Sequence, residues 1–416
     1  MRILFFSHYF WPEGNAPATR VYELTRRWAR SGHDVTVVTG VPNVPSGVPY
    51  EGYRNLLLQE ERVEGVRTIR VWTYLAPNKG TFRRTLNYLS YVPFSLWASA
   101  KAPFPDVVIA TSPQFLCGWA GAFASRLRRR HFVLEVRDIW PDSILAVEAL
   151  RCRAIIRCLE ALEMRLYRRT DRIVTVGDGY AESLAGKGVP MEHVSILPNG
   201  VDLEKFSPRD DDAGFRRRYG LGDSFVCIYA GTIGMAAGLE AVIGAAVQVK
   251  AGGRKDIRFV LAGDGADLER MRAAVERSNL DNVVITGRLG KEEVIRALSA
   301  CNACLVHLKR TELFRTVIPS KIYEAAAMAR PIILGVEGKA AELVKGHEAG
   351  ICIEPENPRQ LAEAVIRLAD EPELARNLGR NGRERLAAKF DYNRLADDYL
   401  QILSVVLRDR ALASLS

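Results

Sequence analysis

A lysine and a glutamate lie where a short apolar helix is predicted to begin, in the segment IPSKIYEAAAMARPIIL of residues 318–334. Ser320 is a good N-cap for that helix, and Lys321 follows in the first turn, where the helix dipole disfavours a cation. Glu324 lies one residue too late to complete a capping box with Ser320. Because helix chemistry explains neither charge, we interpret the pair as a candidate binding site.

A nucleoside diphosphate bound at this helix would account for both charges. Lys321 would neutralise the phosphate groups, and the first-turn N–H groups would bind their oxygen atoms. Glu324, one turn further on, would accept hydrogen bonds from the ribose hydroxyls. Arg315, just upstream, would add a cation that can bind phosphate in a bidentate manner. The alternative is that Lys321 and Glu324 are solvated on an exposed face.

A glycine-rich turn is a second candidate for phosphate binding. In YAGTIGMAAGLEAV a predicted strand is followed by Gly231, Thr232 and Gly234, and then by a helix. Backbone N–H groups at such a helix start form an anion site, although the turn alone can also require glycine. A second junction, LAGDGADLERM, is not a dinucleotide fingerprint, because Leu268 occupies the position of the third glycine.

Polar side chains also follow two predicted strands in the first half of the chain. Arg137 and Asp138 come directly after the strand 132–136, where a carboxylate is a credible general base or hydroxyl ligand. The loop after the first predicted strand carries four further candidates: His8, Glu13, Gly14 and Asn15. The alternatives are a structural Arg137–Asp138 pair and a loop that merely covers the sheet edge.

The elements that must position these residues alternate along the whole chain. Short β-branched or apolar runs are separated by helical patterns, which predicts an α/β fold with parallel sheets covered on both faces. A turn-rich segment, residues 197–214, interrupts the pattern and divides the chain into two similar halves. Ligands of such sheets bind beyond the carboxyl ends of the strands, so a cleft between the halves is the expected site. The expected domains are residues 1–195, residues 196–390 and a final helix, 391–416.

Composition narrows the class of protein. The 416 residues are 48% hydrophobic and 26% charged, which is typical of a soluble globular protein with two domains. The net charge of +9 predicts an anionic partner, but no zinc-finger spacing or RNP-like run indicates nucleic acid. Seven scattered cysteines favour a reducing compartment, and Cys301 and Cys304 lie in an apolar run typical of a core. No His or Asp cluster indicates a metal, so we expect neither a metal nor a cofactor.

One segment has the composition of a helix that lies on a membrane. Residues 79–101 join a basic flank to an aromatic, uncharged stretch too short to span a bilayer. The candidate membrane residues are Phe82, Arg83, Arg84, Tyr88, Tyr91, Phe94 and Trp97. Arginines in residues 126–131 and 151–169 add to the basic surface, each contributing about 1 kcal/mol near anionic lipid. The alternative is a core helix packed against the first sheet.

Taken in chain order, these motifs resemble those of a retaining glycosyltransferase of the GT4 family, which has the GT-B architecture of two Rossmann-like domains. HVSILPNGVDLEKFSP resembles that family's linker, YAGTIGMAAGLE its phosphate loop and PSKIYEAAAMARPIIL its donor-ribose segment. HYFWPE, EVRDIWPDS and FRTVIPSKIYEA are similar to the subgroup of O-antigen N-acetyl-L-fucosaminyltransferases and colanic-acid glycosyltransferases.

The resemblance implies a role for each candidate. The loop at Gly231 and Lys321 would address the donor diphosphate, Glu324 its ribose, and the backbone at Arg288 and Leu289 its base. Gly14 and Asp138 would face the reacting sugar. The final helix would cross back to the first domain. No residue is an obvious covalent nucleophile, so the resemblance implies front-face displacement, in which a diphosphate oxygen takes the acceptor's proton without a metal.

The chain departs from the family pattern at four positions. The family's phosphate-binding Arg and Lys fall at Thr232 and Ala237, the first glutamate of its paired motif at Thr316, and its catalytic-site histidine at Arg137. Arg315 and Lys321 are therefore the candidates for the missing positive charge. These departures leave open a non-catalytic nucleotide-binding subunit of a glycan assembly complex. A nucleotide-sugar epimerase is another alternative, and an NAD-dependent dehydrogenase lacks a complete fingerprint.

The favoured function is transfer of a sugar, an N-acetylated hexosamine on a UDP-linked donor, to a polyprenyl-diphosphate-linked saccharide. The product would be a bacterial surface polysaccharide such as O-antigen, capsule or exopolysaccharide. The partners would be the nucleotide-sugar donor, the lipid-linked acceptor and an anionic membrane surface, without nucleic acid. We expect a cytoplasmic protein attached peripherally to the inner face of the cell membrane.

Overall fold

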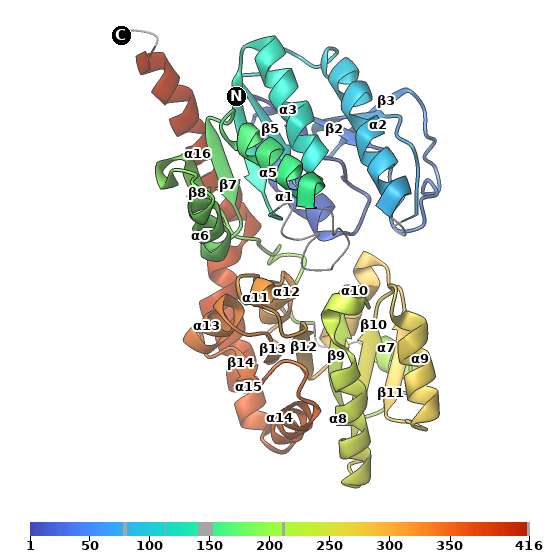
Figure 1. The fold of residues 1–416 in the computed structure, drawn as a ribbon. Coiled ribbons are helices and arrows are strands. Elements are labelled where there is room, and N and C mark those ends of the chain that lie inside the picture. The colour runs from blue at the N-terminus through green and yellow to red at the C-terminus, as the bar shows by residue number, and fades with distance from the viewer. Residues whose placement is uncertain (78–80, 113, 140–152, 210–212, 414–416) are drawn as a thin grey trace. The chain divides into compact units, whose positions relative to one another are not determined.

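The computed structural model describes residues 1–77, 81–112, 114–139, 153–209 and 213–413 (Figure 1). Side chains are described for the same residues except 81–82 and 409–413. The three aspartates of the predicted linker, residues 210–212, and the first two residues of the predicted basic helix, 151–152, lie outside this description. The chain divides into unit 1, residues 1–199 with those from 392 onward, and unit 2, residues 200–391.

The described part of unit 1 holds a sheet of eight strands in the order β3-β4-β2-β1-β5-β6-β7-β8. The strands are β1 Arg2–Phe6, β2 Asp34–Gly40, β3 Leu58–Val63, β4 Val66–Val71, β5 Val107–Thr111, β6 His131–Val136, β7 Arg172–Thr175 and β8 Val194–Ile196. Neighbouring strands run parallel except β3, which pairs with β4 as an antiparallel strand at the edge. The carboxyl ends of the parallel strands therefore meet at one edge of the sheet.

Helices cover both faces of this sheet. They are α1 Ala16–Arg30, α2 Thr81–Ser99, α3 Phe115–Arg128, α5 Arg153–Tyr167, α6 Asp178–Gly186 and α16 Tyr392–Ala413. Successive side chains of a strand point to opposite faces, and β1 follows this rule. Ile3 and Phe5 pack with α1 and α16, whereas Leu4 and Phe6 pack with α2 and α3. The apolar run of β1 is thus buried on both sides, as the sequence predicts.

The last helix, α16, belongs to unit 1 although 192 residues of unit 2 precede it in the chain. Trp28 of α1 donates a hydrogen bond from Nε1 to the carbonyl oxygen of Ala396 at 3.0 Å. The ring of Tyr399 packs edge-on against Trp28 and is fully buried. Figure 1 shows α16, in red, alongside β7, whose Val174 shares the same core.

The described part of unit 2 holds a six-stranded parallel sheet in the order β11-β10-β9-β12-β13-β14. Its strands are β9 Phe225–Ala230, β10 Ile257–Ala262, β11 Val283–Gly287, β12 Ala303–His307, β13 Ile332–Gly335 and β14 Gly350–Cys352. Its helices are α7 Ala213–Arg218, α8 Glu240–Ala251, α9 Leu268–Arg277, α10 Lys291–Ala300, α11 Glu312–Arg315, α12 Lys321–Ala327, α13 Lys339–Gly346, α14 Pro358–Asp370 and α15 Pro372–Asn381. The predicted α/β class with Rossmann-like halves is confirmed.

Candidate active site

In unit 2 the loops that follow β9 and β10 lie directly against each other. The N–H group of Gly231 donates to the carbonyl oxygen of Ala262 at 2.8 Å. A Cβ atom on Gly263 would lie 1.8 Å from the carbonyl oxygen of Gly231, so only glycine allows this approach. The glycines of YAGTIG and of LAGDG therefore build one shared surface at the carboxyl edge of the sheet.

Lys321, the first residue of α12, lies on this surface. A Cβ atom on Gly231 would be 2.2 Å from Cε of Lys321, which means that the lysine occupies the space above the glycine. Lys321 Nζ donates to the hydroxyl of Tyr229 at 2.7 Å and lies 3.9 Å from the centre of that ring. The Tyr229 hydroxyl in turn donates to the carbonyl oxygen of Thr232 at 2.8 Å. The structure thus brings together three predicted site residues, Gly231, Thr232 and Lys321.

Burial moves the pKa values of the two charged residues of this site, Lys321 and Glu324, toward neutral pH. Desolvation lowers the pKa of Lys321 to about 8, with Glu324 opposing the shift. Desolvation likewise raises the pKa of Glu324 to about 7, with Lys321 opposing. Both side chains are half-buried, so a pair solvated on an exposed face is wrong. Among the described residues neither group forms an ion pair within 4.0 Å, which leaves the ammonium available to an anion.

Backbone N–H groups at the start of α12 form hydrogen bonds within the protein, whereas the sequence predicted that they would be free to bind a ligand. The N–H of Ile322 donates to Pro319, and those of Tyr323 and Glu324 both donate to the carbonyl oxygen of Ser320. Ser320 has helical backbone angles, and its side chain makes no capping hydrogen bond. The prediction of a bare first turn capped by Ser320 is therefore wrong, because the helix begins with tight turns that engage its own amides. The ammonium of Lys321, which has no ion-pair partner in the described chain, is therefore the group of this segment that remains available to an anion.

The remaining predicted donor residues lie in loops of unit 2. Arg315, at the end of α11, donates to Glu312 at 3.2 Å and is about half exposed, so solvent screens its charge. The hydroxyl of Thr316 donates to the carbonyl oxygen of Leu313 at 2.8 Å. Arg288 is exposed, whereas Leu289 packs partly on the core. Gly234 is half-buried before the short turn 235–237.

Two residues that sequence reasoning missed hold the glycine loop in place. Tyr229 is the first, as described above. The second is His307, at the end of β12, whose Nδ1 donates to the carbonyl oxygen of Ala237 at 2.7 Å. Its Nε2 accepts the N–H of Glu356 at 2.9 Å, and burial lowers its pKa, so the ring is neutral. Both residues end buried strands, where their side chains look like core positions in the sequence.

In unit 1 the polar residues after β6 are fixed by their neighbours. Ser112, after β5, accepts the N–H groups of Arg137 at 2.8 Å and of Asp138 at 3.3 Å through its hydroxyl oxygen. Arg137 Nη2 donates to the side-chain oxygen of Asn199 at 3.2 Å. Burial and the nearby guanidinium of Arg20 lower the pKa of Arg137. Ser112 and Asn199 were not predicted as site residues.

The loop after β1 has mostly structural contacts. His8 is buried, pairs through Nε2 with the side-chain oxygen of Asn87 at 2.7 Å, and has a pKa lowered by desolvation to about 4. The carboxylate of Glu13 accepts backbone N–H groups of Asn43 and Val44, and desolvation raises its pKa to about 7. Asn15 caps α1 by accepting the N–H of Ala18 at 2.9 Å, and Gly14 is exposed.

The predicted membrane helix, α2, is partly a core helix. Tyr91 is fully buried and donates to the carbonyl oxygen of Val38 at 2.7 Å, so its assignment to a membrane face is wrong. Phe94 packs edge-on against Trp72. Trp97 is 50% exposed and Arg83 and Arg84 are exposed, with Arg84 over the ring of Tyr88. The side chain of Phe82 lies outside the described side chains.

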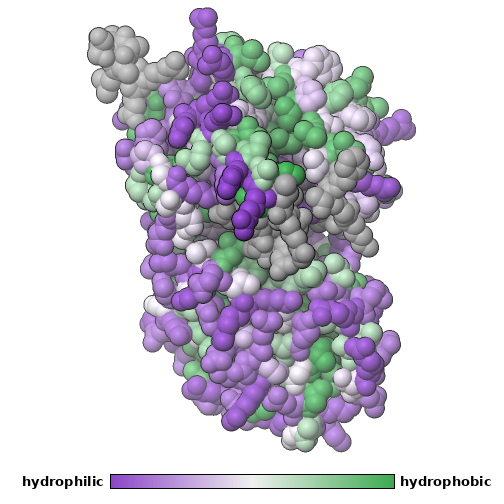
Figure 2. Space-filling model, viewed as in Figure 1, coloured by the Kyte–Doolittle hydropathy of each residue, from purple (hydrophilic) through white to green (hydrophobic). Residues whose placement is uncertain are grey.

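The helices α2, α3 and α5 form one layer of unit 1 with a mixed outer surface. Figure 2 shows hydrophobic and hydrophilic residues interleaved over these elements. The exposed apolar residues of this layer are Leu89, Trp97, Phe123, Leu127 and Ile155. Within the described ranges, no helix has the length and hydropathy needed to cross a membrane. No group of three or more His, Cys, Asp or Glu residues there is arranged to hold a metal ion.

Comparison with solved structures shows which fold this chain has. The chain superposes on Anabaena HepE in complex with UDP-glucose with a TM-score of 0.74 and 17% identity, covering 97% of this chain and all of that one. It superposes on sucrose-phosphate synthase from Thermosynechococcus elongatus with a TM-score of 0.72 and 21% identity over the full length of both chains. The fold is GT-B, as the resemblance implied.

Two family models place the chain more narrowly. Residues 15–200 match the glycosyl transferase 4-like domain, and residues 212–385 match the glycosyl transferases group 1 domain. The two models together span most of the sequence, and the chain belongs to the GT4 family of glycosyltransferases, enzymes of the hexosyltransferase type.

Curated relatives agree with this family. The colanic acid biosynthesis glycosyl transferase WcaI of Escherichia coli is 24% identical over 381 residues, 88% of this chain and 91% of that protein. The alpha-D-kanosaminyltransferase of Streptomyces kanamyceticus is 29% identical over 242 residues, which cover 56% of this chain and 60% of that protein.

Proposed function

We propose that the chain is a retaining glycosyltransferase that carries a sugar from a nucleoside-diphosphate donor to a polyprenyl-diphosphate-linked saccharide. The product would be a bacterial surface polysaccharide. The observation that carries the proposal is Lys321, a half-buried cation without an ion-pair partner in the described chain, lying on the Gly231 loop. The names of WcaI and of the UDP-glucose complex of HepE support the product class and a UDP-linked donor. The subgroup resemblance favours an N-acetylated hexosamine as the sugar.

In the proposed donor complex, unit 2 holds the nucleotide. Lys321 neutralises the diphosphate above the Gly231–Gly234 loop, Glu324 accepts the ribose hydroxyls, and the backbone at Arg288 and Leu289 flanks the base. Arg315 contributes a weaker, solvent-screened charge. Since a half-buried ammonium is less screened by bulk water than an exposed one, it stabilises the leaving diphosphate more than a surface lysine would.

The chemical step follows from this placement of charge. The acceptor hydroxyl attacks the anomeric carbon on the face from which the diphosphate leaves, and a diphosphate oxygen takes the proton. Asp138 and Arg137, at the carboxyl edge of the sheet in unit 1, would orient the reacting sugar and the acceptor, and Gly14 would face the reacting sugar as the family resemblance implies. Catalysis then depends on stabilising charge that develops on the leaving diphosphate.

The test is incubation with a panel of nucleotide sugars and a lipid-linked acceptor, followed by detection of free nucleoside diphosphate. We expect release only when both substrates are present. A non-catalytic subunit would bind the nucleotide and release nothing, and an epimerase would convert the donor without an acceptor. Thermal shift with the same panel of nucleotides identifies the base.

The pH dependence of kcat/KM is the first prediction. Lys321 carries its charge below about pH 8, and Glu324 is ionised above about pH 7. Diphosphate binding needs the charged lysine, and ribose binding needs the ionised carboxylate. The profile of kcat/KM should therefore be a narrow bell that falls below about 7 and above about 8, which are apparent values of the coupled pair.

The decisive comparison uses Glu324→Gln. This variant should lose the acidic limb of the bell, because its amide does not titrate, while the alkaline limb caused by Lys321 persists. A profile of Glu324→Gln with the same acidic limb as the unaltered enzyme would contradict the role assigned to Glu324.

We also propose that the outer surface of the α2–α3–α5 layer attaches the enzyme peripherally to the cytoplasmic face of the cell membrane, where a lipid-linked acceptor is available. Exposed aromatic and aliphatic side chains lie there beside exposed arginines, the combination that favours the interface of an anionic bilayer. Tyr91 plays no part in this surface.

The second prediction tests that surface with the combined change of Arg83→Gln, Arg84→Gln, Leu89→Ser and Trp97→Ser. Two basic residues contribute about 2 kcal/mol on anionic lipid, so the partition coefficient should fall about thirtyfold from charge alone. Sedimentation with phosphatidylserine-containing vesicles measures it, and Tyr91 stays unchanged because its hydroxyl holds Val38.

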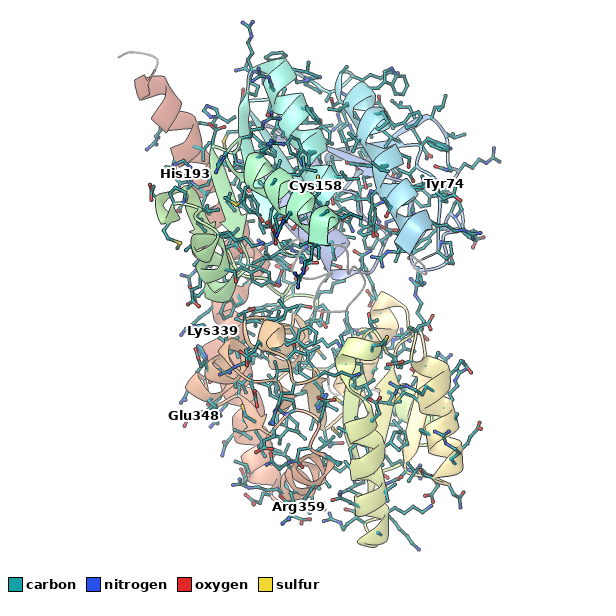
Figure 3. All side chains as sticks on the ribbon, viewed as in Figure 1. Tyr74, Cys158, His193, Lys339, Glu348 and Arg359 are labelled. Atoms are coloured by element: carbon teal, nitrogen blue, oxygen red, sulfur yellow. The ribbon has the colours of Figure 1, made fainter. Side chains whose placement is uncertain are left out.

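The matched control changes two exposed arginines of unit 2, Arg359 and Arg376, to glutamine. Figure 3 shows Arg359 at the surface of α14. This control should sediment with vesicles like the unaltered protein. Equal vesicle binding by the four-residue variant would refute the proposed attachment surface.

A further inference from the structure

A cluster of two arginines and a glutamate lies in unit 1, with Arg20 and Glu135 buried and Arg137 half-buried. Arg20 of α1 and Glu135 of β6 are both fully buried, and Arg20 Nε donates to Glu135 Oε1 at 2.6 Å. The other nitrogens of Arg20 donate to the carbonyl oxygens of Pro198 and Leu197 at 2.5 and 2.9 Å. Arg20 therefore has a partner on each of its nitrogens and pairs with Oε1 of Glu135, whereas Oε2 of Glu135 has no hydrogen-bond partner among the residues described.

Arg137, two residues after Glu135, is the arginine of the cluster whose hydrogen bonds are incomplete. Its Nη2 donates to Asn199 at 3.2 Å, but Nε and Nη1 are buried and have no hydrogen-bond partner among the residues described. Glu135 lies close enough to attract it, yet that carboxylate already pairs with Arg20. Leaving the buried Nε and Nη1 groups of this guanidinium unpaired is costly, so a structural role alone does not explain the arginine.

The surroundings of Arg137 are those of a ligand site. Ser112 follows β5, Arg137 follows β6, Tyr180 lies on the helix after β7 and Asn199 follows β8. All four thus belong to the carboxyl edge of one parallel sheet, where ligands of such sheets bind. Tyr180 is near enough to Arg137 for the two to interact electrostatically. The groups that converge here are the guanidinium of Arg137, two hydroxyls and an amide, with the carboxylate of Asp138 also close enough to act on Tyr180.

We propose that Arg137 binds an anionic oxygen of a substrate, a carboxylate or a phosphate, through its Nε and Nη1 groups. The inference rests on the proposed function and names the substrate class of the unit 1 site. The anion has two possible sources with the same chemistry: the carboxylate of a uronic-acid-type sugar, or the diphosphate of the lipid-linked acceptor. A guanidinium donates charge-assisted hydrogen bonds to either.

The experiment uses the full chain with the Lys321→Ala change, which removes the other proposed anion site. Binding of inorganic pyrophosphate, D-glucuronate and uncharged D-glucose is measured by thermal shift and calorimetry, against chloride at equal ionic strength. We expect stabilisation by pyrophosphate or glucuronate and none by glucose. A response to glucuronate identifies a charged sugar, and a response to pyrophosphate identifies the acceptor diphosphate.

Adding Arg137→Met to Lys321→Ala should weaken that binding about tenfold to a hundredfold. Arg137→Lys, which keeps the charge but loses the planar fork, should give an intermediate loss. Arg359→Met, at an exposed site, is the matched control and should change nothing. The shift is read relative to the melting temperature of each variant without ligand, so altered stability does not imitate altered binding.

Two results would overturn the inference: no anion-specific stabilisation of the Lys321→Ala chain, or the same stabilisation after Arg137→Met. If Arg137→Met does not fold, the first measurement and Arg137→Lys decide the question. Failure of the proposed function is separate, because it would be seen as UDP binding that Lys321→Ala leaves unchanged. Anion binding that depends on Arg137 could survive that outcome.

Discussion

Changing Lys321 to alanine should lower kcat at saturating donor by about a hundredfold to a thousandfold, the range typical of removing one group that stabilises charge in a transition state. The ammonium lies on the Gly231 loop, shares a hydrogen bond with Tyr229 and has no competing carboxylate within ion-pair distance in the described chain. Its charge is therefore available to an anion that binds at the Gly231 loop.

The reason for a loss in kcat, beyond a loss in KM, is that negative charge on the bridging oxygen increases as the glycosidic bond breaks. A cation placed there binds the transition state more tightly than the ground state. Release of nucleoside diphosphate, followed in steady state with donor and acceptor both saturating, measures the effect. Lys321→Ala should also lack the alkaline limb of the pH profile, since that limb is assigned to the lysine.

The controls distinguish a local from a general effect. Arg359→Ala, in the same unit but exposed and paired with Glu363, should keep the full rate. Tyr229→Phe keeps the ring under the ammonium and loses the hydroxyl that accepts its hydrogen bond, so it should show a smaller loss. A Lys321→Ala enzyme within a few-fold of the normal rate would show that the leaving-group charge is stabilised elsewhere.

The second large effect is on stability. Glu135→Ala should destabilise unit 1 by about 3–5 kcal/mol, because it leaves the buried guanidinium of Arg20 without its carboxylate. All six tryptophans of the chain occur at position 140 or earlier, in the residues of unit 1. Tryptophan fluorescence during urea unfolding therefore follows this unit separately from unit 2.

Glu60→Ala is the matched control, since Glu60 pairs with Arg67 in the same unit but near the surface. It should cost less than about 1 kcal/mol. Adding Arg20→Met to Glu135→Ala should recover part of the loss, because both charges of the pair are then absent. A Glu135→Ala midpoint equal to that of Glu60→Ala would show that the pair contributes little.

The Arg20–Glu135 pair also predicts the direction in which the stability of unit 1 changes in acid. Although desolvation alone would raise it, the pKa of Glu135 is lowered by Arg20 and Arg137. A carboxylate whose pKa is depressed by folding contributes stability above its unfolded value of about 4.3. That contribution declines as the pH falls through the depressed folded value. The difference in free energy of unfolding between the unaltered protein and Glu135→Ala should therefore become smaller in acid.

Much of this architecture can be predicted from the sequence, and the reason is physical. Strands of a parallel sheet are buried on both faces, so β1 and β9 read as continuous apolar runs and the α/β alternation is visible. The meeting of Lys321 with the Gly231 loop is also predictable, because both follow strands of one sheet and their carboxyl ends share an edge. What the sequence predicts well is which residues share an edge.

Contacts between side chains are harder to predict. Tyr229 and His307 lie at or next to the carboxyl ends of buried strands. Their spacing in the sequence does not distinguish a side chain that holds a loop from an ordinary core residue. Tyr91 has the composition of a membrane-facing residue but the period of a core one, since Asn87, Tyr91, Ser95 and Ala98 recur every three or four residues and are all buried. The short α12 begins with tight turns that its own residues close, which no capping pattern indicates.

The position of α16 has a consequence for how the protein is made. The core on one side of the unit 1 sheet includes Tyr392, Leu395, Tyr399 and Leu403, which the ribosome adds after every residue of unit 2. During translation all residues of unit 2 are synthesised before those of α16. The core of unit 1 around Trp28 therefore stays incomplete until the last helix emerges from the ribosome. A stop codon near residue 390 would thus damage the half of the protein farthest from it in the gene.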